Sequence, residues 1–392
     1  MLNLWHAICY ILSHMKRTVF IERGIMKKAV VVLLAIGFLA ILAFANVGCL
    51  KKKNRSKGTV VYSSGQFQIS TVAGTTGIRN NTSISLSPAN KIYITYDDSI
   101  SGGLKCATNL NGSWQVYTPD GVGLVGEYSS LKIDSIGTPH MSYYDKTNGD
   151  LKYATLTGTW QANTIDSTGN IGEFTSLGID SIGKIHISYY DVTNGDLKYA
   201  TNASGTWGTS VIIPGLDDVG QFNSLAIDLA NKIHISYSNK ATGNLEYVTN
   251  ASGLWQVSII DSTSGEVCDY SSLALDSADK AHVSYCDETS GNLKYATNAS
   301  GPWQITTIDS TGLVGEYSSL AVDSANRIHI AYYDRSNGDL KYATNTTGQW
   351  ITMTIDSAGN VGDCLSLEIG PDGRIYISYH DDSTDSLKCA SK

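Results

Sequence analysis

Cysteine is scarce in this chain, and the usual catalytic motifs do not occur in it. Seven cysteines are spread irregularly over 392 residues, and no two of them stand as Cys-x-x-Cys. This usage excludes a disulfide-rich scaffold. Gly-x-Ser-x-Gly, a phosphate-binding loop and His-Glu-x-x-His are also missing, so no familiar signature of catalysis points to an enzyme.

Positive charge is concentrated at the N-terminal end, and the remainder of the chain is acidic. Residues 1–57 hold ten Lys and Arg and one acid, Glu22. Subtracting these from the totals of 28 and 36 leaves 18 basic and 35 acidic residues, a charge of −17, for residues 58–392. Such a field repels phosphate backbones, which argues against nucleic acid as a partner. Cations, glycans and basic protein surfaces remain open as partners.

A short apolar run near the N-terminus predicts export. Lys27-Lys28 precedes 17 uncharged residues, 29–45, and Val47-Gly48-Cys49 follows them. This order of basic, apolar and small residues is typical of an export signal, and the run is short for a membrane-spanning helix, which needs about 20 residues. Its end resembles a bacterial or archaeal lipobox, although Asn46 stands where Leu is usual. The resemblance implies lipidation of Cys49, and an uncleaved anchor helix is the alternative.

These features predict four regions. Residues 1–25 are expected to be a misassigned start or a cytoplasmic extension, and 26–49 a signal peptide with a lipobox or a membrane anchor. Residues 50–65 form a basic linker, and 66–392 form the folded domain. We expect the protein to be exported, and to be anchored to the outer face of the cytoplasmic membrane or the cell envelope through its lipid or its N-terminal helix.

One stretch recurs seven times. Copies of Ile-His-Ile-Ser-Tyr-Tyr-Asp (185–191) return every 46 to 48 residues, with His or Tyr at the second place: Tyr93, His140, His186, His234, His282, His329 and Tyr376. The alternation of apolar and polar residues predicts a β-strand, and the fixed period predicts one supersecondary unit used repeatedly. In the unit at 176–213, turns at 181–183 and 193–195 separate short strands, and Asn194-Gly195 is a strong hairpin signal.

Four strands at this period predict an all-β fold, a seven-bladed β-propeller of four-stranded blades. Tryptophan marks only six fourth strands, namely Trp114, Trp160, Trp207, Trp255, Trp303 and Trp350. The last unit ends after three strands, so we predict that an N-terminal strand at 66–72 completes the last blade and joins the chain ends. A stacked solenoid is the alternative, but it would need polar caps at both ends.

The five repeated histidines are interpreted as structural. A buried imidazole needs hydrogen-bond partners, and Asp180, Ser188 and Trp207 are candidates for His186 in its unit. WD40 propellers satisfy a similar histidine in this way. Metal binding by these histidines is the alternative, but they belong to different blades.

Two sets of polar residues predict a site at one mouth of the channel. The first, an inner ring, stands thirteen positions before each repeated mark: Asn80, Glu127, Glu173, Gln221, Asp269, Glu316 and Asp363. The second, an outer ring, opens the loop between the second and third strands: Asp98, Asp145, Asp191, Asn239, Asp287, Asp334 and Asp381. Propeller connectivity places both loops on one face. Carboxylates so arranged collect cations, and Ca²⁺ is the candidate ion. Turn chemistry is the alternative for the outer ring, and a solvated surface for the inner one.

Single residues break the symmetry of the repeat. Cys268 and Cys286 fall in one unit and are a candidate disulfide in an oxidising compartment. Cys364 and His380 in the last unit suggest a thiol–imidazole nucleophile or a metal-binding pair, with simple packing as the alternative. Cys106 and Cys389 stand where other units have tyrosine, which indicates a substitution in the core.

The repeat Ser-Leu-x-Ile-Asp-Ser…His-Ile-Ser-Tyr-Tyr-Asp…Gly-Asp-Leu-Lys-Tyr-Ala-Thr…Gly-x-Trp, from 83 to 390, resembles propeller repeats of exported prokaryotic proteins. It is loosely similar to sialidase-type propellers and to lectin propellers. The resemblance implies a fold rather than an activity, because the sialidase box Ser-x-Asp-x-Gly-x-Thr-Trp is missing and only four arginines follow residue 57.

Three functions follow from these observations. The leading hypothesis is an anchored, monomeric binding module that makes contact through its acidic mouth. A carbohydrate-binding lectin or adhesin is the alternative. A hydrolase or lyase like those of the sialidase superfamily, using Asp363, Cys364, His380 and Asp381, is the second alternative.

Overall fold

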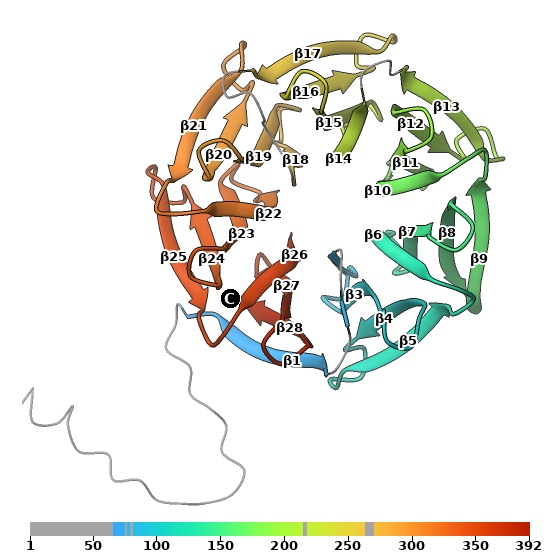
Figure 1. Ribbon diagram of the computed structural model, residues 1–392, viewed down its shortest axis with the longest axis horizontal. Coiled ribbons are helices and arrows are strands. Elements are labelled where there is room, and N and C mark those ends of the chain that lie inside the picture. Colours follow the sequence, from blue (N-terminus) through green and yellow to red (C-terminus); the bar gives the residue numbers. More distant parts are fainter. Residues whose placement is uncertain (1–65, 75–76, 79–80, 215–217, 263–269) are drawn as a thin grey trace, which may run out of the picture. The chain divides into compact units, whose positions relative to one another are not determined.

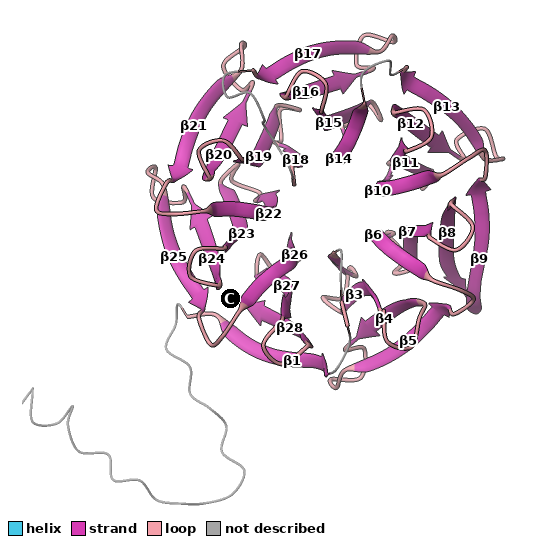
Figure 2. Ribbon diagram, viewed as in Figure 1, coloured by secondary structure: helices cyan, strands magenta, loops and turns pink. Residues whose placement is uncertain are grey.

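Seven four-stranded antiparallel sheets stand in a ring around a central channel (Figures 1 and 2). The computed structural model describes residues 66–74, 77–78, 81–214, 218–262 and 270–392. The predicted all-β, seven-bladed propeller is confirmed. Within these residues no helix is long and apolar enough to cross a membrane. The apolar run at 29–45 and Cys49 lie outside the described residues, so export and lipidation stay predictions.

The first four blades follow the chain in order from the channel outward. Blade one contains β2 (Thr82–Leu86), β3 (Ile92–Asp97), β4 (Leu104–Thr108) and β5 (Gln115–Asp120). Blade two contains β6 (Val125–Ile133), β7 (Pro139–Asp145), β8 (Asp150–Thr157) and β9 (Thr159–Asp166). Blade three contains β10 (Ile171–Ile179), β11 (Ile185–Asp191), β12 (Asp196–Thr201) and β13 (Gly208–Ile213). Blade four contains β14 (Val219–Ile227), β15 (Ile233–Asn239), β16 (Asn244–Thr249) and β17 (Gln256–Asp261).

Blades five and six continue this order, and blade seven is made from both ends of the described chain. Blade five contains β18 (Ser272–Leu275), β19 (Ala281–Asp287), β20 (Asn292–Thr297) and β21 (Gln304–Asp309). Blade six contains β22 (Val314–Val322), β23 (Ile328–Asp334), β24 (Asp339–Thr344) and β25 (Ile351–Asp356). Blade seven contains β26 (Val361–Ile369), β27 (Ile375–Asp381), β28 (Ser386–Ser391) and, outermost, β1 (Gln68–Gly74).

Closure by the N-terminal strand is therefore confirmed. β1 pairs antiparallel with β28 from Gln68 opposite Ser391 to Gly74 opposite Ser386. Phe67, just before β1, packs edge-on against Tyr342 of blade six with ring centroids 5.3 Å apart. In blades three to six the tryptophan before the fourth strand packs in this way on the preceding blade, as Trp207 does on Tyr153 at 5.1 Å. Phe67 thus takes the place of a tryptophan in the blade that lacks one.

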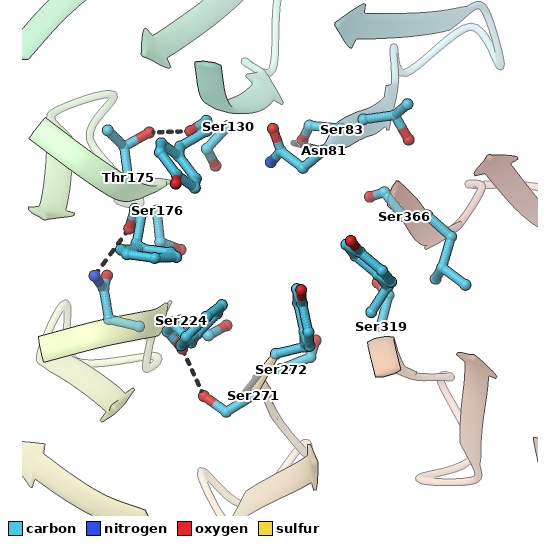
Figure 3. Close-up of a pocket in the computed structure, with 18 of the residues that line it drawn as sticks. Asn81, Ser83, Ser130, Thr175, Ser176, Ser224, Ser271, Ser272, Ser319 and Ser366 are labelled. Carbon is cyan, nitrogen blue, oxygen red and sulfur yellow. Dashed lines mark hydrogen bonds between the residues drawn. The ribbon is translucent and has the colours of Figure 1, made fainter. Parts of the chain in front are cut away.

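A ring of hydrogen bonds joins the innermost strands of all seven blades. Each innermost strand carries one serine whose hydroxyl accepts a hydrogen bond from a backbone N–H of the next blade, as Ser130 does from Leu177 at 3.0 Å. The seven bonds measure 2.9 to 3.3 Å, and the serines are Ser83, Ser130, Ser176, Ser224, Ser272, Ser319 and Ser366. Figure 3 shows these serines around the channel. They satisfy backbone donors that have no strand beside them.

The repeated histidines hold blades two to six together internally. His186 bonds the Tyr199 hydroxyl through Nδ1, and its Nε2 lies 3.2 Å from Asp180 Oδ2. The prediction that Asp180 is a partner of His186 is confirmed, whereas the same prediction for Ser188 and Trp207 is wrong. Ser188 donates instead to Asn223 of the next blade. The Trp207 ring stacks on the preceding blade.

In blades one and seven the histidine and tyrosine of this pair are replaced by a tyrosine and a cysteine. Tyr93 and Tyr376 stand at the histidine position, opposite the strand that carries Cys106 and Cys389 at the tyrosine position. Both cysteines are buried, at 0% and 3% exposure. The larger ring on one strand is thus matched by a smaller side chain on the next, so the core volume is conserved.

A second buried network crosses between blades. The Tyr189 hydroxyl of blade three donates to Asp166 Oδ2 of blade two at 2.7 Å, and Lys198 Nζ lies 2.7 Å from the same oxygen. Blade four departs from this pattern, because Ile213 of blade three stands where the aspartate would be. Glu246 there replaces the lysine and accepts a hydrogen bond from Tyr237 at 2.7 Å. The two changes compensate each other, so no buried charge is left without a partner.

Deleting residues 66–74 should strongly destabilise the propeller. The deletion leaves the β28 backbone without its partner strand and removes the buried Val72 side chain. We expect the melting temperature to fall by roughly 10 °C or more, measured by circular dichroism. Deletion of residues 58–65 alone is the control. An unchanged melting temperature after removal of 66–74 would contradict closure by β1.

The histidines should make stability fall with acidification. Burial lowers the pKa of His140, His186, His282 and His329 below 6.5. Below about pH 6.5 the unfolded chain therefore takes up more protons than the folded one, so stability present at pH 7.5 is lost towards pH 5.5. The pKa of His380 is raised, so its protonation favours the folded state as the pH falls and offsets part of this loss of stability.

Thermal unfolding at pH 7.5 and 5.5 checks this expectation. The chain should melt at a lower temperature at pH 5.5, and the difference should shrink in His186→Asn. That variant should itself cost about 1–3 kcal/mol, because Tyr199 and Asp180 lose a buried partner. A melting temperature that rises on acidification would show that the histidines do not control this range.

Candidate functional site

In five blades (two, three, four, six and seven) the first strand begins in a bulge at the predicted mouth. In β10, Glu173 lies opposite Tyr190 and Ser176 opposite Ser188, so two residues of β10 have no partner on β11. The preceding Gly172 has φ +105°, and a Cβ there would lie 2.8 Å from Leu151 Cα of blade two. Only glycine fits this approach. At the bulge the residue after the inner-ring residue, Phe174 in β10, lines the channel cavity.

The residue after each inner-ring residue forms a feature that the sequence analysis missed, a ring of aromatic side chains. Tyr128, Phe174, Phe222, Tyr270 and Tyr317 all have left-handed backbones, with φ from +48° to +65°. Their ring centroids follow one another at 4.5, 4.4, 4.9 and 4.1 Å. We call these five residues the aromatic collar. Such a conformation costs an aromatic residue about 1–3 kcal/mol and is concentrated at functional sites.

Polar groups of the next blade hold the collar in place. Thr175 Oγ1 of blade three donates to the Tyr128 carbonyl oxygen at 2.8 Å. In the same way, Asn223 Nδ2 of blade four donates to the Phe174 carbonyl oxygen at 2.8 Å. Ser271 and Ser318 make the same bond to Phe222 and Tyr270. Four of the five strained residues are therefore fixed by the blade that follows their own.

The channel and its mouth are hollow. A cavity of about 320 Å³ is lined by the collar and by the serine ring below it (Figure 3). A second cavity of about 610 Å³ lies at blades five to seven, where Tyr270, Tyr317, Glu316, Arg335 and Asp363 line it. A ligand at this mouth would meet aromatic rings and carboxylates together.

The collar is open at blades seven and one, where Cys364 and Asn81 take the aromatic positions. Cys364 is 1% exposed, and burial raises the pKa of its thiol well above the usual range, with Asp363 adding to the effect. The thiol is therefore protonated at neutral pH and is a poor nucleophile. His380 Nδ1 lies 3.3 Å from Asp363 Oδ1, and its Nε2 lies 3.5 Å from Asp385 Oδ1. These carboxylates raise the pKa of His380 against the effect of burial.

The described inner-ring residues differ in their partners. Glu127 pairs with Lys146 at 2.9 Å and Glu316 with Arg335 at 3.0 Å. Gln221 Nε2 donates to Asp218 Oδ1 at 3.0 Å. Burial raises the pKa of Glu173, and the Glu127 carboxylate raises it further. Asn80 and Asp269 lie outside the described residues, so nothing is known of their place.

The outer-ring aspartates are buried and paired. Asp145, Asp191, Asp334 and Asp381 are 1–2% exposed, and each lies 2.6–3.8 Å from a lysine of the third strand. They also accept hydrogen bonds from backbone N–H groups of their own turns, as Asp191 does from Asn194 at 3.1 Å. This is the geometry of turn chemistry, and ligand binding by these four residues stays a prediction.

Two further site predictions remain open. Among the described residues, no three or more His, Cys, Asp or Glu side chains come together in a way that could hold a metal. Calcium binding therefore rests on the sequence pattern alone. Cys268 lies outside the described residues, so its disulfide with Cys286 stays a prediction. Cys286 itself is buried, with its sulfur 3.6 Å from the Val314 carbonyl oxygen.

Comparison with known proteins identifies the fold and no family. No family model matches the chain, and no curated protein does so either. A streptogramin B lyase is 10% identical with a TM-score of 0.57, covering 83% of this chain and 97% of its own. A polysaccharide lyase of family PL25, an ulvan lyase bound to -[GlcA(1-4)Rha3S]-, is 13% identical with a TM-score of 0.58, covering 81% and 94%. Trans-sialidases and a fucose-specific lectin from Aleuria aurantia are also among the matches.

The two lyases, with TM-scores above 0.5, are similar to this chain in fold alone. The chain is a seven-bladed β-propeller with an acidic, aromatic mouth at one end of its channel. At such low identity the likeness carries no activity to this chain.

Proposed function

We propose that this protein is a binding module, that its contact surface is the channel mouth, and that it carries out no reaction of its own. The aromatic collar is the observation that carries the proposal. Five neighbouring blades each keep an aromatic side chain in a costly left-handed conformation, and separate hydrogen bonds from the next blade fix four of these residues. Cys364 of blade seven has the same left-handed backbone, at φ +51°, so the bulge sets this conformation, and the five neighbouring aromatic rings placed in it distinguish the mouth.

The chemistry of the mouth selects the kind of ligand. Aromatic faces attract cations and also stack on the apolar faces of sugar rings, and nearby carboxylates favour cations or hydroxyl donors. Lys240 Nζ already lies 5.2 Å from the centroid of the Phe222 ring, so the collar accepts a cation of its own chain. Polyanions are disfavoured by the charge of −17 that residues 58–392 carry.

A hydrolase or lyase site is less well supported. The Cys364 thiol has a raised pKa, and Asp381 is engaged by Lys388 at 2.6 Å. Of the described arginines, Arg327 and Arg335 flank opposite ends of β23 and cannot converge on one carboxylate. Only the His380–Asp363 pair remains from the residues predicted for catalysis.

Neutralising the mouth should abolish binding. The triple variant Glu127→Gln, Glu173→Gln, Glu316→Gln removes three inner-ring charges, and Glu368→Gln is the matched control. Glu368 pairs with Lys132 at 3.5 Å on a part of β26 beyond the serine ring. Full-length protein would be tested on a glycan array and on an array of basic peptides. We expect a ligand whose affinity falls at least about tenfold in the triple variant and stays unchanged in the control.

The two arrays also separate the alternatives. A glycan that binds in a way that depends on the mouth would identify a lectin, and a basic peptide would identify a protein-binding module. Binding that is equally strong in the triple variant would place the contact surface elsewhere. No ligand on either array would remove the proposal.

A further inference from the structure

The repeats themselves show where a cation sits at the mouth. The residue that follows the outer-ring position has the same backbone place in successive blades. Its N–H donates to the carbonyl oxygen three residues before the inner-ring residue, as Lys146 does to Leu124 at 2.9 Å and Arg335 to Leu313 at 2.9 Å. We call this place the mouth turn position. In blades two and six its basic side chain pairs with the inner-ring glutamate, and in blade four Lys240 lies over the collar.

Blade three keeps the glutamate and the aromatic ring but lacks the base. Val192 occupies the mouth turn position, with its N–H 2.9 Å from the Asn170 carbonyl oxygen, and its side chain is 37% exposed. Glu173 and Phe174 stand at the inner-ring and collar positions. The Phe174 ring centroid lies 4.5 Å from that of Tyr128 and 4.4 Å from that of Phe222, so Phe174 is the second of the five collar rings and has a ring on each side.

No cation of the described residues pairs directly with Glu173. No described residue gives its side chain a hydrogen bond or an ion pair, and Lys146, the cation that acts on it, is bonded to Glu127. The Glu127 carboxylate and partial burial both disfavour its charged form. A cation from outside would relieve this cost, as Lys146 and Arg335 do for the equivalent glutamates.

We propose that blade three is a subsite for a ligand's ammonium or guanidinium group, which pairs with Glu173 and lies against Phe174 in the place where other blades put their own basic side chain. The inference rests on the proposed function and names its ligand class. Asp218 of blade four, which accepts hydrogen bonds from Tyr190 and Gln221, adds a second carboxylate beside this place. A ligand with more than one cationic group would engage both carboxylates.

Two probes distinguish the sources of such a group. Hexalysine represents a basic peptide and spermine represents a small polyamine, and both would be titrated by calorimetry into the full chain at low salt. Hexaglutamate is the negative control. Binding of hexalysine alone assigns a peptide ligand, and binding of spermine with equal or greater affinity assigns a polyamine.

Variants at Val192 test the subsite without touching the collar. Val192→Lys supplies the missing base from within and should lower probe affinity at least about tenfold, as Glu173→Gln should. Val192→Thr has a similar shape without charge and should bind like the parent. Lys146→Val removes the internal base in blade two and should strengthen probe binding several-fold by exposing Glu127. Thermal unfolding would verify that each variant folds.

The outcomes separate this inference from the proposed function. Equal affinities for Val192→Lys and Val192→Thr would overturn the blade-three subsite. The wild-type protein could bind neither probe but bind a glycan that the mouth triple variant does not bind. The proposal of a cationic ligand would then be wrong, and the proposal of a binding module would stand. If the triple variant kept full affinity for hexalysine, both would fall.

Discussion

The propeller depends on satisfying the backbone of its innermost strands. Each of these strands has a sheet neighbour on one side only, and its other edge faces the channel. Seven serine hydroxyls accept N–H bonds from the next blade, and the seventh bond, from Ile84 to Ser366, links blade one to blade seven. Each bond contributes about 0.5–1.5 kcal/mol, but the set closes only if seven blades complete a circle. β1 completes blade seven on its outer side, in the blade that this seventh bond joins to blade one.

The sequence predicted the scaffold well because the scaffold is repeated. A period of 46 to 48 residues, the hairpin glycines and the six tryptophans were enough to predict the blade count and the closing strand. The partners of His186 were predicted only in part, since Tyr199 lies on the neighbouring strand and its register with β11 is not visible in the sequence. Asp180, six residues away, was within reach of a local argument.

The site was harder to predict than the fold. The inner ring was predicted from its spacing, but the aromatic collar was missed. Aromatic residues rarely adopt a left-handed backbone, and residue propensities do not predict where they do so. The available signal was the recurrence of Tyr or Phe directly after the acid in Gly-Glu-Tyr and Gly-Glu-Phe. The burial of the outer-ring aspartates depends on lysines that also pair with an aspartate of the preceding blade, as Lys198 does with Asp166. The sequence of a single repeat does not reveal contacts between blades.

Departures from the repeat fall into two classes. Some are compensated by a second change, as Ile213 is by Glu246 and Tyr93 is by Cys106, and these conserve the packing and charge of the scaffold. Others have no compensation within the described residues, and they gather at the mouth. Val192 beside Glu173 is the clearest of these. This contrast between a compensated core and an uncompensated mouth supports the proposed binding role of the mouth.

A double-mutant cycle on Glu173 and Val192, measured as hexalysine affinity by calorimetry, tests this account most directly. If the lysine of Val192→Lys acts by occupying Glu173, the substitution should cost at least about fivefold less affinity in the Glu173→Gln background than in the parent. Equal losses in both backgrounds would mean that the added charge acts only through the general field of the mouth. That result would contradict a cation subsite in blade three.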